Sequence, residues 1–111
     1  MESLSIGNYV EYAGVLCEIL GINQNGYLQT NGVEAPKEAF NFIKITDDLL
    51  CDIGYNKNKE YFKFKSHTIY KYNDMYLCIK NRTILTYLHE IQNLLWFTKC
   101  IKIKYPSKHY I

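Results

Sequence analysis

Residues His89-Glu90-Ile91-Gln92-Asn93 have the spacing of a helical zinc-protease motif but lack its second histidine. That chemistry needs two imidazole ligands four residues apart on one helix face, with a glutamate beside them as general base. Asn93 takes the second ligand position, and an asparagine amide is a poor ligand for zinc. We therefore expect no metal and no cofactor. His89, Glu90 and Asn93 are predicted instead to form a hydrogen-bonding patch that contacts a partner or a loop.

The other titratable residues form no catalytic constellation in the sequence. His67 and His109 have no nucleophile or acid beside them, and a helix start explains the adjacent Asp47 and Asp48. The six glycines are scattered singly, so the sequence has no phosphate-binding loop. A triad assembled across the fold stays open. We nevertheless expect a protein that is not an enzyme and predict no catalytic residue.

In the expected strand 60–65, a tyrosine and two lysines alternate with two phenylalanines, and two further lysines directly precede the strand. In a strand Phe62 and Phe64 point to one side and Tyr61 to the other, together with the lysines. Lysines with an interleaved aromatic ring suit a phosphate backbone and a stacked base. An ordinary solvated sheet face gives the same pattern, so both readings stay open.

These observations define two groups of candidate binding residues. The predicted nucleic-acid or partner-binding residues are Lys57, Lys59, Tyr61, Lys63, Lys65, Lys80, Arg82, Lys102 and Lys104. Those predicted to contact a partner from the long helix are His89, Glu90, Asn93 and Phe97.

The net charge of +2 conceals a division of the chain at Gly54. The segment up to Gly54 contains eight acids and two bases, a net charge of −6. The segment from Tyr55 onward contains three acids and eleven bases, a net charge of +8. A basic half attracts nucleic acid or acidic protein surfaces, and an acidic half repels nucleic acid. The same division also arises if the halves simply attract each other within one fold.

Length and composition favour a cytoplasmic protein of one compact unit. The chain has 111 residues, 48% of them hydrophobic, and no apolar run approaches the roughly 18 residues of a membrane span. Its first residues lack the basic and apolar regions of a signal peptide. The four cysteines are spaced too widely for a usual zinc pattern, and their apolar contexts predict buried, reduced thiols.

The candidate residues are held by elements that differ between the two halves. Apolar residues recur with a helical period from Thr83 to Cys100, which predicts a long helix that covers a sheet. Phe97 falls outside its apolar arc. Before this helix, segments 60–65, 68–72 and 75–80 are expected to form antiparallel strands, and 101–104 a last edge strand.

The first half is expected to be rich in short strands. Turn signals at Ala13-Gly14, Gln24-Asn25-Gly26 and Asn31-Gly32 predict a meander resembling an SH3-like small barrel. Thr46 is the predicted N-cap of a short linking helix that ends at Gly54. The predicted fold is thus α+β: an acidic SH3-like subdomain with its linking helix at 1–54, and a basic sheet covered by one long C-terminal helix at 55–111.

Three segments, Ile6–Val10, Ile45–Tyr55 and Tyr87–Leu94, occur in an order that resembles small proteins from prophages and mobile elements of Bacteroides-like and flavobacterial hosts. The resemblance spans most of the chain. Members of that family follow the helix with a Thr-Gly turn and an acidic Glu-Leu ending, whereas this chain continues from Thr98 into the basic segment 101–104. The resemblance implies a mobile-element protein in a bacterial cytoplasm and carries over no catalytic residue.

The resemblance and the charge division lead to three expectations of function. The first is an accessory protein that binds a host protein–RNA machine, in its most specific form an anti-CRISPR inhibitor of an RNA-guided effector nuclease with its guide RNA, of the RNA-targeting type VI. The second is a freestanding module that binds RNA or single-stranded nucleic acid. The third is a virion or assembly component that associates through Trp96, Phe97 and the edge strand at 101–104. None of the three involves a membrane, and the oligomeric state stays open.

Overall fold

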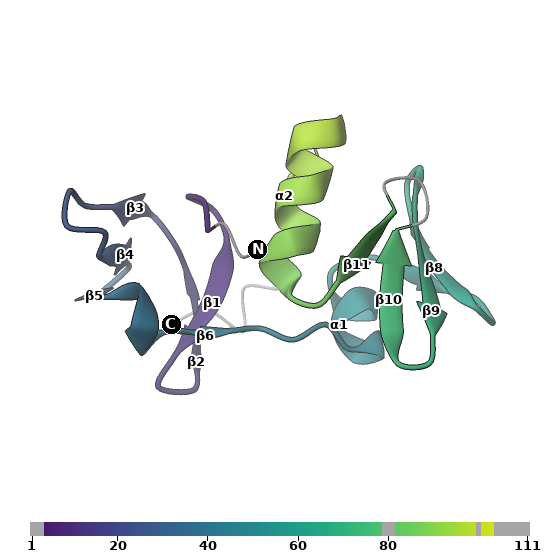
Figure 1. The fold of residues 1–111 in the computed structure, drawn as a ribbon, viewed down its shortest axis with the longest axis horizontal. Coiled ribbons are helices and arrows are strands. Elements are labelled where there is room, and N and C mark those ends of the chain that lie inside the picture. Colours follow the sequence, from purple (N-terminus) through teal and green to yellow (C-terminus); the bar gives the residue numbers. More distant parts are fainter. Residues whose placement is uncertain (1–3, 79–81, 100, 104–111) are drawn as a thin grey trace.

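The computed structural model describes residues 4–78, 82–99 and 101–103. Figure 1 shows short strands at one end, a larger sheet at the other, and one main helix between them. This arrangement confirms the predicted α+β class.

Six short strands and a turn of 3-10 helix make up the N-terminal end. They form two three-stranded antiparallel sheets, one in the order β2-β1-β6 and one in the order β3-β4-β5. The described residues form no closed barrel, so the SH3-like barrel stays a prediction. The bounds are β1 Tyr9–Tyr12, β2 Val15–Glu18, β3 Gly21–Ile22, β4 Leu28–Thr30, β5 Val33–Ala35, η1 Lys37–Ala39 and β6 Asn41–Phe42.

The short helix α1, Asp47–Asp52, begins where the sequence predicts. The Thr46 side chain accepts a hydrogen bond from the Leu49 N–H at 3.1 Å, which is the predicted N-cap. Gly54 follows with a φ of +117°, a conformation that glycine adopts without steric cost.

The C-terminal end is a five-stranded antiparallel sheet in the order β11-β10-β9-β8-β7. Strands that are consecutive in the chain are neighbours throughout this sheet. The strands are β7 Asn56–Lys57, β8 Tyr61–Phe64, β9 His67–Tyr72, β10 Met75–Cys78 and β11 Thr83–Leu85.

The main helix α2 covers Leu88–Lys99 and is shorter than predicted. Thr83–Leu85 pairs with β10 instead, because its residues find backbone partners there that an isolated first helical turn lacks. The Glu90 carboxylate accepts hydrogen bonds from the N–H groups of Thr86 and Tyr87, at 2.7 and 2.8 Å, and so caps the helix start. The edge strand predicted at 101–104 is wrong for Ile101–Ile103, which are not in a strand, and Lys104 lies outside the described residues.

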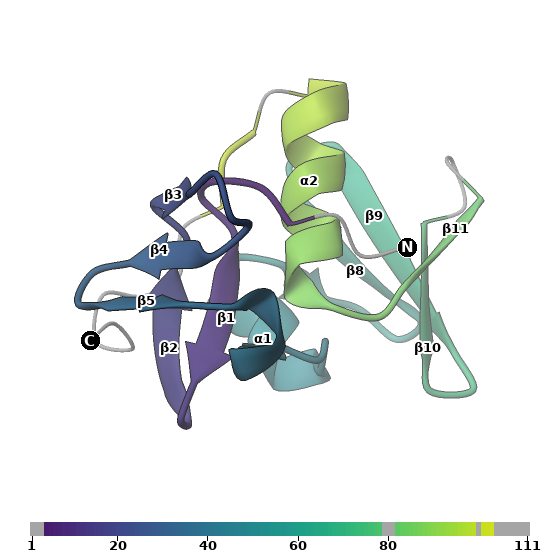
Figure 2. The ribbon, with the colours of Figure 1, turned by 60° about the vertical axis from the view of Figure 1, so that its left-hand side comes forward.

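One large apolar cluster joins the two ends of the molecule. Tyr9 and Leu16 of the N-terminal sheet pack in the same cluster as residues of α1, α2 and the five-stranded sheet. Figures 1 and 2 both place α2 between β1 and that sheet, and its buried Leu88, Ile91 and Leu95 belong to the cluster. A second cluster lies within the N-terminal end and contains Val10, Cys17, Ile19, Leu28, Ala35 and Phe40.

The prediction that every cysteine is buried is wrong for Cys51. This thiol is exposed on α1, where the apolar neighbours Leu49 and Leu50 face the core instead. Cys17 and Cys78 are buried, as expected, and Cys100 lies outside the described residues.

Candidate binding surfaces

The five-stranded sheet has one face packed on the core and one face open to solvent. Phe62 and Ile69 are opposite each other and buried, and with Tyr76 they form the inner face toward α1 and α2. Because side chains alternate along each strand, their neighbours point the other way. We call this second side the outer face: it comprises Asn56, Tyr61, Lys63, Thr68, Tyr70, Tyr72, Met75, Leu77 and Ile84.

The register places four outer-face side chains in one row across β8, β9, β10 and β11. Tyr61 is opposite Tyr70, Tyr70 is opposite Leu77, and Leu77 is opposite Ile84. The rings of Tyr61 and Tyr70 have centroids 5.8 Å apart. Tyr70 is 40% exposed, and Tyr72, two residues further along β9, is 63% exposed. The outer face is therefore a largely apolar, aromatic surface without a described element over it.

Three of the predicted basic residues lie on or beside this face. Lys63 belongs to the outer face, where it is opposite Thr68 and Asn56. Lys65 is in the turn between β8 and β9 and Arg82 directly precedes β11, so both are at the same end of the sheet as Lys63. All three side chains are exposed, as is Lys59 beyond the opposite end of β8.

Lys57 does not join this group, contrary to the prediction. It is opposite Phe62 on the inner side, and its Nζ is 3.2 Å from the Asp47 carboxylate of α1. The reason is the register of β7, which turns Asn56 outward and Lys57 toward the helix. Lys102 is also separate, because it lines a pocket beside α2. Lys80 and Lys104 lie outside the described residues.

His89, which was predicted to form a hydrogen-bonding patch with Glu90 and Asn93, is fully buried. Its ring packs against Phe42, at a centroid distance of 4.8 Å, and stacks nearly parallel to Tyr87. The strand β6 and the segment before α2 therefore cover this part of the helix. Glu90 forms the helix cap described above, so its carboxylate binds the segment of its own chain that precedes α2.

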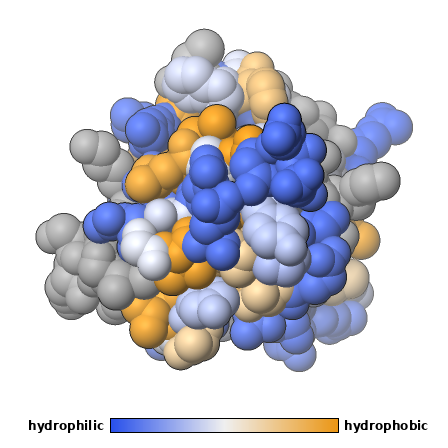
Figure 3. Space-filling model, turned by 90° about the vertical axis from the view of Figure 1, so that its left-hand side faces the viewer, coloured by the Kyte–Doolittle hydropathy of each residue, from blue (hydrophilic) through white to orange (hydrophobic). Residues whose placement is uncertain are grey.

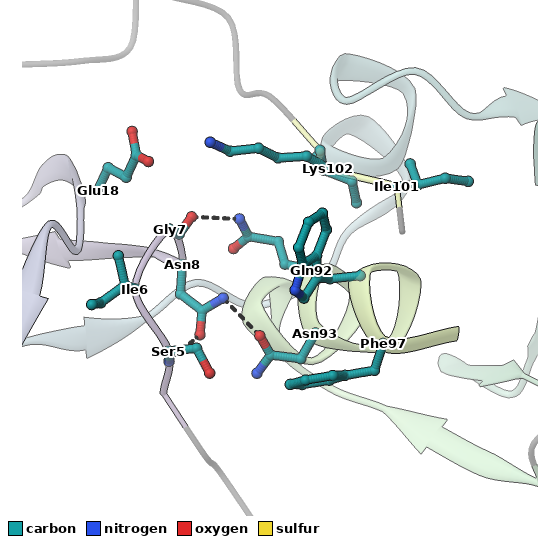
Figure 4. A pocket seen from close by; sticks show the side chains of 12 residues that line it. Ser5, Ile6, Gly7, Asn8, Glu18, Gln92, Asn93, Phe97, Ile101 and Lys102 are labelled. Carbon is teal, nitrogen blue, oxygen red and sulfur yellow. Dashed lines mark hydrogen bonds between the residues drawn. The ribbon is translucent and has the colours of Figure 1, made fainter. Parts of the chain in front are cut away.

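Asn93 contacts a segment of its own chain. The Asn8 side-chain amide donates to Asn93 Oδ1 at 2.9 Å. Next to it, Gln92 accepts from the Tyr9 N–H and donates to the Gly7 carbonyl oxygen, both at 2.9 Å. Figure 4 shows Gln92 and Asn93 pointing toward Gly7 and Asn8. The amide face of α2 therefore fixes the start of β1, a role the sequence did not assign to Gln92.

Beyond these amides, α2 carries an exposed apolar surface. Phe97 is 75% exposed and Trp96 is 53% exposed, and both border a pocket of about 320 Å³ that Ile6 also lines. Glu18 and Lys102 belong to the same pocket and supply one charge of each sign. We call this the α2 surface. Phe97, which falls outside the predicted apolar arc, is thus exposed.

The opposite, N-terminal end carries exposed apolar residues of its own. Leu20, Ile22 and Tyr27 are exposed around β3 and β4. Figure 3 shows this end as small hydrophobic groups separated by hydrophilic side chains. Single exposed apolar residues of this kind are ordinary on protein surfaces, so we place no site there.

A buried chain of polar side chains crosses the inner side of the sheet. The Tyr55 hydroxyl is 2.8 Å from His67 Nδ1, and Cys78 Sγ is 3.6 Å from His67 Nε2. Burial, with a smaller contribution from the Lys99 charge, lowers the pKa of His67, and burial raises the pKa of Tyr55. A thiol beside an imidazole is the pairing of cysteine hydrolases, but all three side chains are buried in the core. We therefore interpret this chain as hydrogen bonding that satisfies buried polar groups.

Among residues 4–78, 82–99 and 101–103, no three His, Cys, Asp or Glu side chains are grouped so that they could hold a metal ion. Neither helix in this part of the chain has the length and apolar character needed to cross a membrane.

No family model, curated protein or solved structure matches this chain.

Proposed function

We propose that this chain is a non-enzymatic binding protein, an accessory protein of a phage or mobile element that engages a host protein–RNA machine. The observation that carries the proposal is the presence of two exposed surfaces of different chemistry on different elements. The outer face combines tyrosines with Lys63, and the α2 surface combines Trp96 and Phe97 with a pocket. The first has the chemistry of a nucleic-acid contact and the second that of a protein contact.

The α2 surface supports the protein part of the proposal. Tryptophan and phenylalanine are enriched at protein interfaces, where large side chains fill pockets of the partner. Trp96 and Phe97 are adjacent on the last turns of α2, and neither belongs to the apolar clusters that hold the fold together. Exposing two such side chains costs solubility without stabilising the folded chain. An interface explains why they are there.

The narrower proposal is inhibition of an RNA-guided effector nuclease, of the RNA-targeting type VI. It is supported by the resemblance to mobile-element proteins, since such elements encounter host defences, and by the division of charge at Gly54. In this proposal the basic half contacts guide RNA or the margin of its channel. The acidic half presents carboxylates where the effector binds phosphate.

The proposal is tested by capturing partners of the tagged chain from a lysate of its bacterial host, with and without ribonuclease. We expect an RNA-guided effector that stays bound after ribonuclease treatment. A variant with Trp96→Ala and Phe97→Ala should lose it, whereas Ile22→Ala with Tyr27→Ala, a matched pair of exposed residues at the other end, should retain it. Capture that is equal for both double variants, or no effector at all, contradicts the proposal.

A second candidate, favoured by the row of outer-face side chains, is a freestanding RNA-binding module. It predicts that the eluate contains RNA alone and that ribonuclease removes it. Binding to bare RNA then weakens steeply with salt, because each neutralised phosphate releases counterions. Ordered self-association of the purified chain through Trp96 and Phe97 would instead indicate an assembly component.

We also propose that the strands from β1 to β6 form an SH3-like small barrel. Its support is that β2 and β3 are separated by only Ile19 and Leu20, as in one bent strand shared by two sheets. Val10 of one sheet and Leu28 of the other belong to the same apolar cluster. An experimental structure in which these two sheets do not face each other would exclude this arrangement.

A further inference from the structure

We propose that the outer face binds single-stranded RNA, with bases stacked on Tyr61, Tyr70 and Tyr72 and with phosphates held by Lys63, Lys65 and Arg82. The inference rests on the proposed function and deepens it, because it assigns the RNA contact to one face and one direction across the sheet.

The row Tyr61, Tyr70, Leu77 and Ile84 supplies the platform for the bases. Three strand spacings of about 4.8 Å give a row of about 14 Å, which accommodates two to three bases laid side by side. Tyr61 and Tyr70 form its aromatic end, and the aliphatic Leu77 and Ile84 continue the row. Stacking on such rings tolerates any base, because every base presents a π face.

The charges around this face fit a phosphate backbone on one side of the row. Lys63, Lys65 and the start of β11 are at one end of the sheet, whereas Glu60, which directly precedes β8, is at the other end. Asp74 is in the turn between β9 and β10, at the opposite end. A single strand therefore crosses the β-strands with its bases on this row and on Tyr72, and with its phosphates toward Lys63 and Arg82.

The polar side chains beside Lys63 favour RNA over DNA. Thr68 and Asn56 are opposite Lys63 on either side, so a hydroxyl and an amide flank the position assigned to the backbone. Such groups hydrogen-bond the 2′-hydroxyl, which is present only in RNA. A duplex does not fit the proposal, because its bases are already paired and stacked.

The test is the fluorescence anisotropy of a labelled oligouridine of about twelve nucleotides, titrated with the purified full chain. We expect Tyr70→Ala to weaken binding at least about fivefold, the loss of one stacked base. The matched control is Tyr27→Ala, since Tyr27 is 41% exposed and Tyr70 is 40% exposed, but Tyr27 belongs to the other end of the molecule. Circular dichroism checks that each variant folds, and Tyr72→Ala replaces Tyr70→Ala if the latter does not.

The same titration is repeated at different salt concentrations and with other types of nucleic acid. With three cations on phosphates, the affinity should fall roughly twentyfold between 50 and 200 mM salt, and Lys63→Glu with Lys65→Glu should flatten this dependence. Equal affinities of the Tyr70→Ala and Tyr27→Ala variants, tighter binding to oligothymidine or duplex RNA, or no binding by the unmodified chain each overturn the inference. If a nuclease-resistant effector is nevertheless captured from the host lysate, the proposed function stands and only the outer-face assignment fails.

Discussion

At the scale of single residues, Asp47 connects the linking helix to the five-stranded sheet. Its carboxylate accepts hydrogen bonds from the Tyr76 hydroxyl at 2.6 Å, from Lys71 at 3.0 Å and from Lys57 at 3.2 Å. The Tyr76 bond is the main cause of a pKa lowered to about 2, and the Lys71 bond is the next. Lys57 and Lys71 therefore bind α1 on the inner side of the sheet and do not belong to the outer face.

This lowered pKa predicts a pH-dependent stability. The folded chain holds Asp47 ionised more strongly than the unfolded chain, where the pKa is about 3.9, so its contribution is complete above about pH 5 and is lost as the pH falls toward 2. We expect Asp47→Asn to cost about 1–2 kcal/mol at pH 7, after allowance for partial exposure, and clearly less at pH 3. Urea unfolding at both pH values measures this change in the free energy of unfolding. The control is Asp48→Asn, because Asp48 is in the same helical turn but is exposed. An Asp47→Asn cost that does not change with pH contradicts the assignment.

At the scale of elements, α2 is held at two places by different interactions. Leu88, Ile91 and Leu95 bury its apolar side in the shared core, and Gln92 binds the backbone at Gly7 and Tyr9. The helical period predicted the burial of these three residues correctly, but it was wrong for Ile84 and Trp96, which are exposed. It did not predict that Gln92 binds the N-terminal segment. The sequence pattern around a helical glutamine is the same whether its side chain contacts water or a strand.

The contact of Gln92 predicts a specific loss of stability. Gln92→Ala leaves the buried Tyr9 N–H without its side-chain acceptor, and we expect a cost of about 1–3 kcal/mol in the free energy of unfolding. Phe97→Ala, five residues away on the same helix, should stay within about 0.5 kcal/mol of the unmodified chain because Phe97 is exposed. Equal effects of the two substitutions in chemical unfolding would show that Gln92 does not hold β1.

The start of α2 shows where sequence patterns reach their limit. Thr83, Ile84 and Leu85 fit a helical period and a strand equally well, and pairing with β10 decides between them. The outer face illustrates the same point. Alternation within β8 predicted Tyr61 and Lys63 on one side, but Tyr70, Leu77 and Ile84 join them only through a register that is set across four strands.

At the scale of the whole molecule, one core spans the acidic and the basic half. Tyr9 and Leu16 come from the acidic half, and they share the main cluster with Phe62, Ile69 and Ile91 of the basic half. The division of charge at Gly54 therefore does not coincide with a division of the core.

This shared core predicts cooperative unfolding. Trp96 fluorescence and far-ultraviolet circular dichroism, which report on α2 and on the entire backbone, should give the same urea midpoint. Ile91→Ala should lower both midpoints together and cost about 2–5 kcal/mol, because Ile91 is fully buried where the halves meet. Two separate midpoints, or a shift in only one of them, would mean that the halves unfold independently.

Our proposal assigns the outer face to RNA and leaves the α2 surface for a protein partner. Its most direct test is an NMR titration of the isotope-labelled chain with oligouridine. We predict that the backbone amide signals of Tyr61, Tyr70 and Leu77 shift, while those of Trp96 and Phe97 stay in place. Shifts confined to α2, or none at saturating RNA, would contradict the claim.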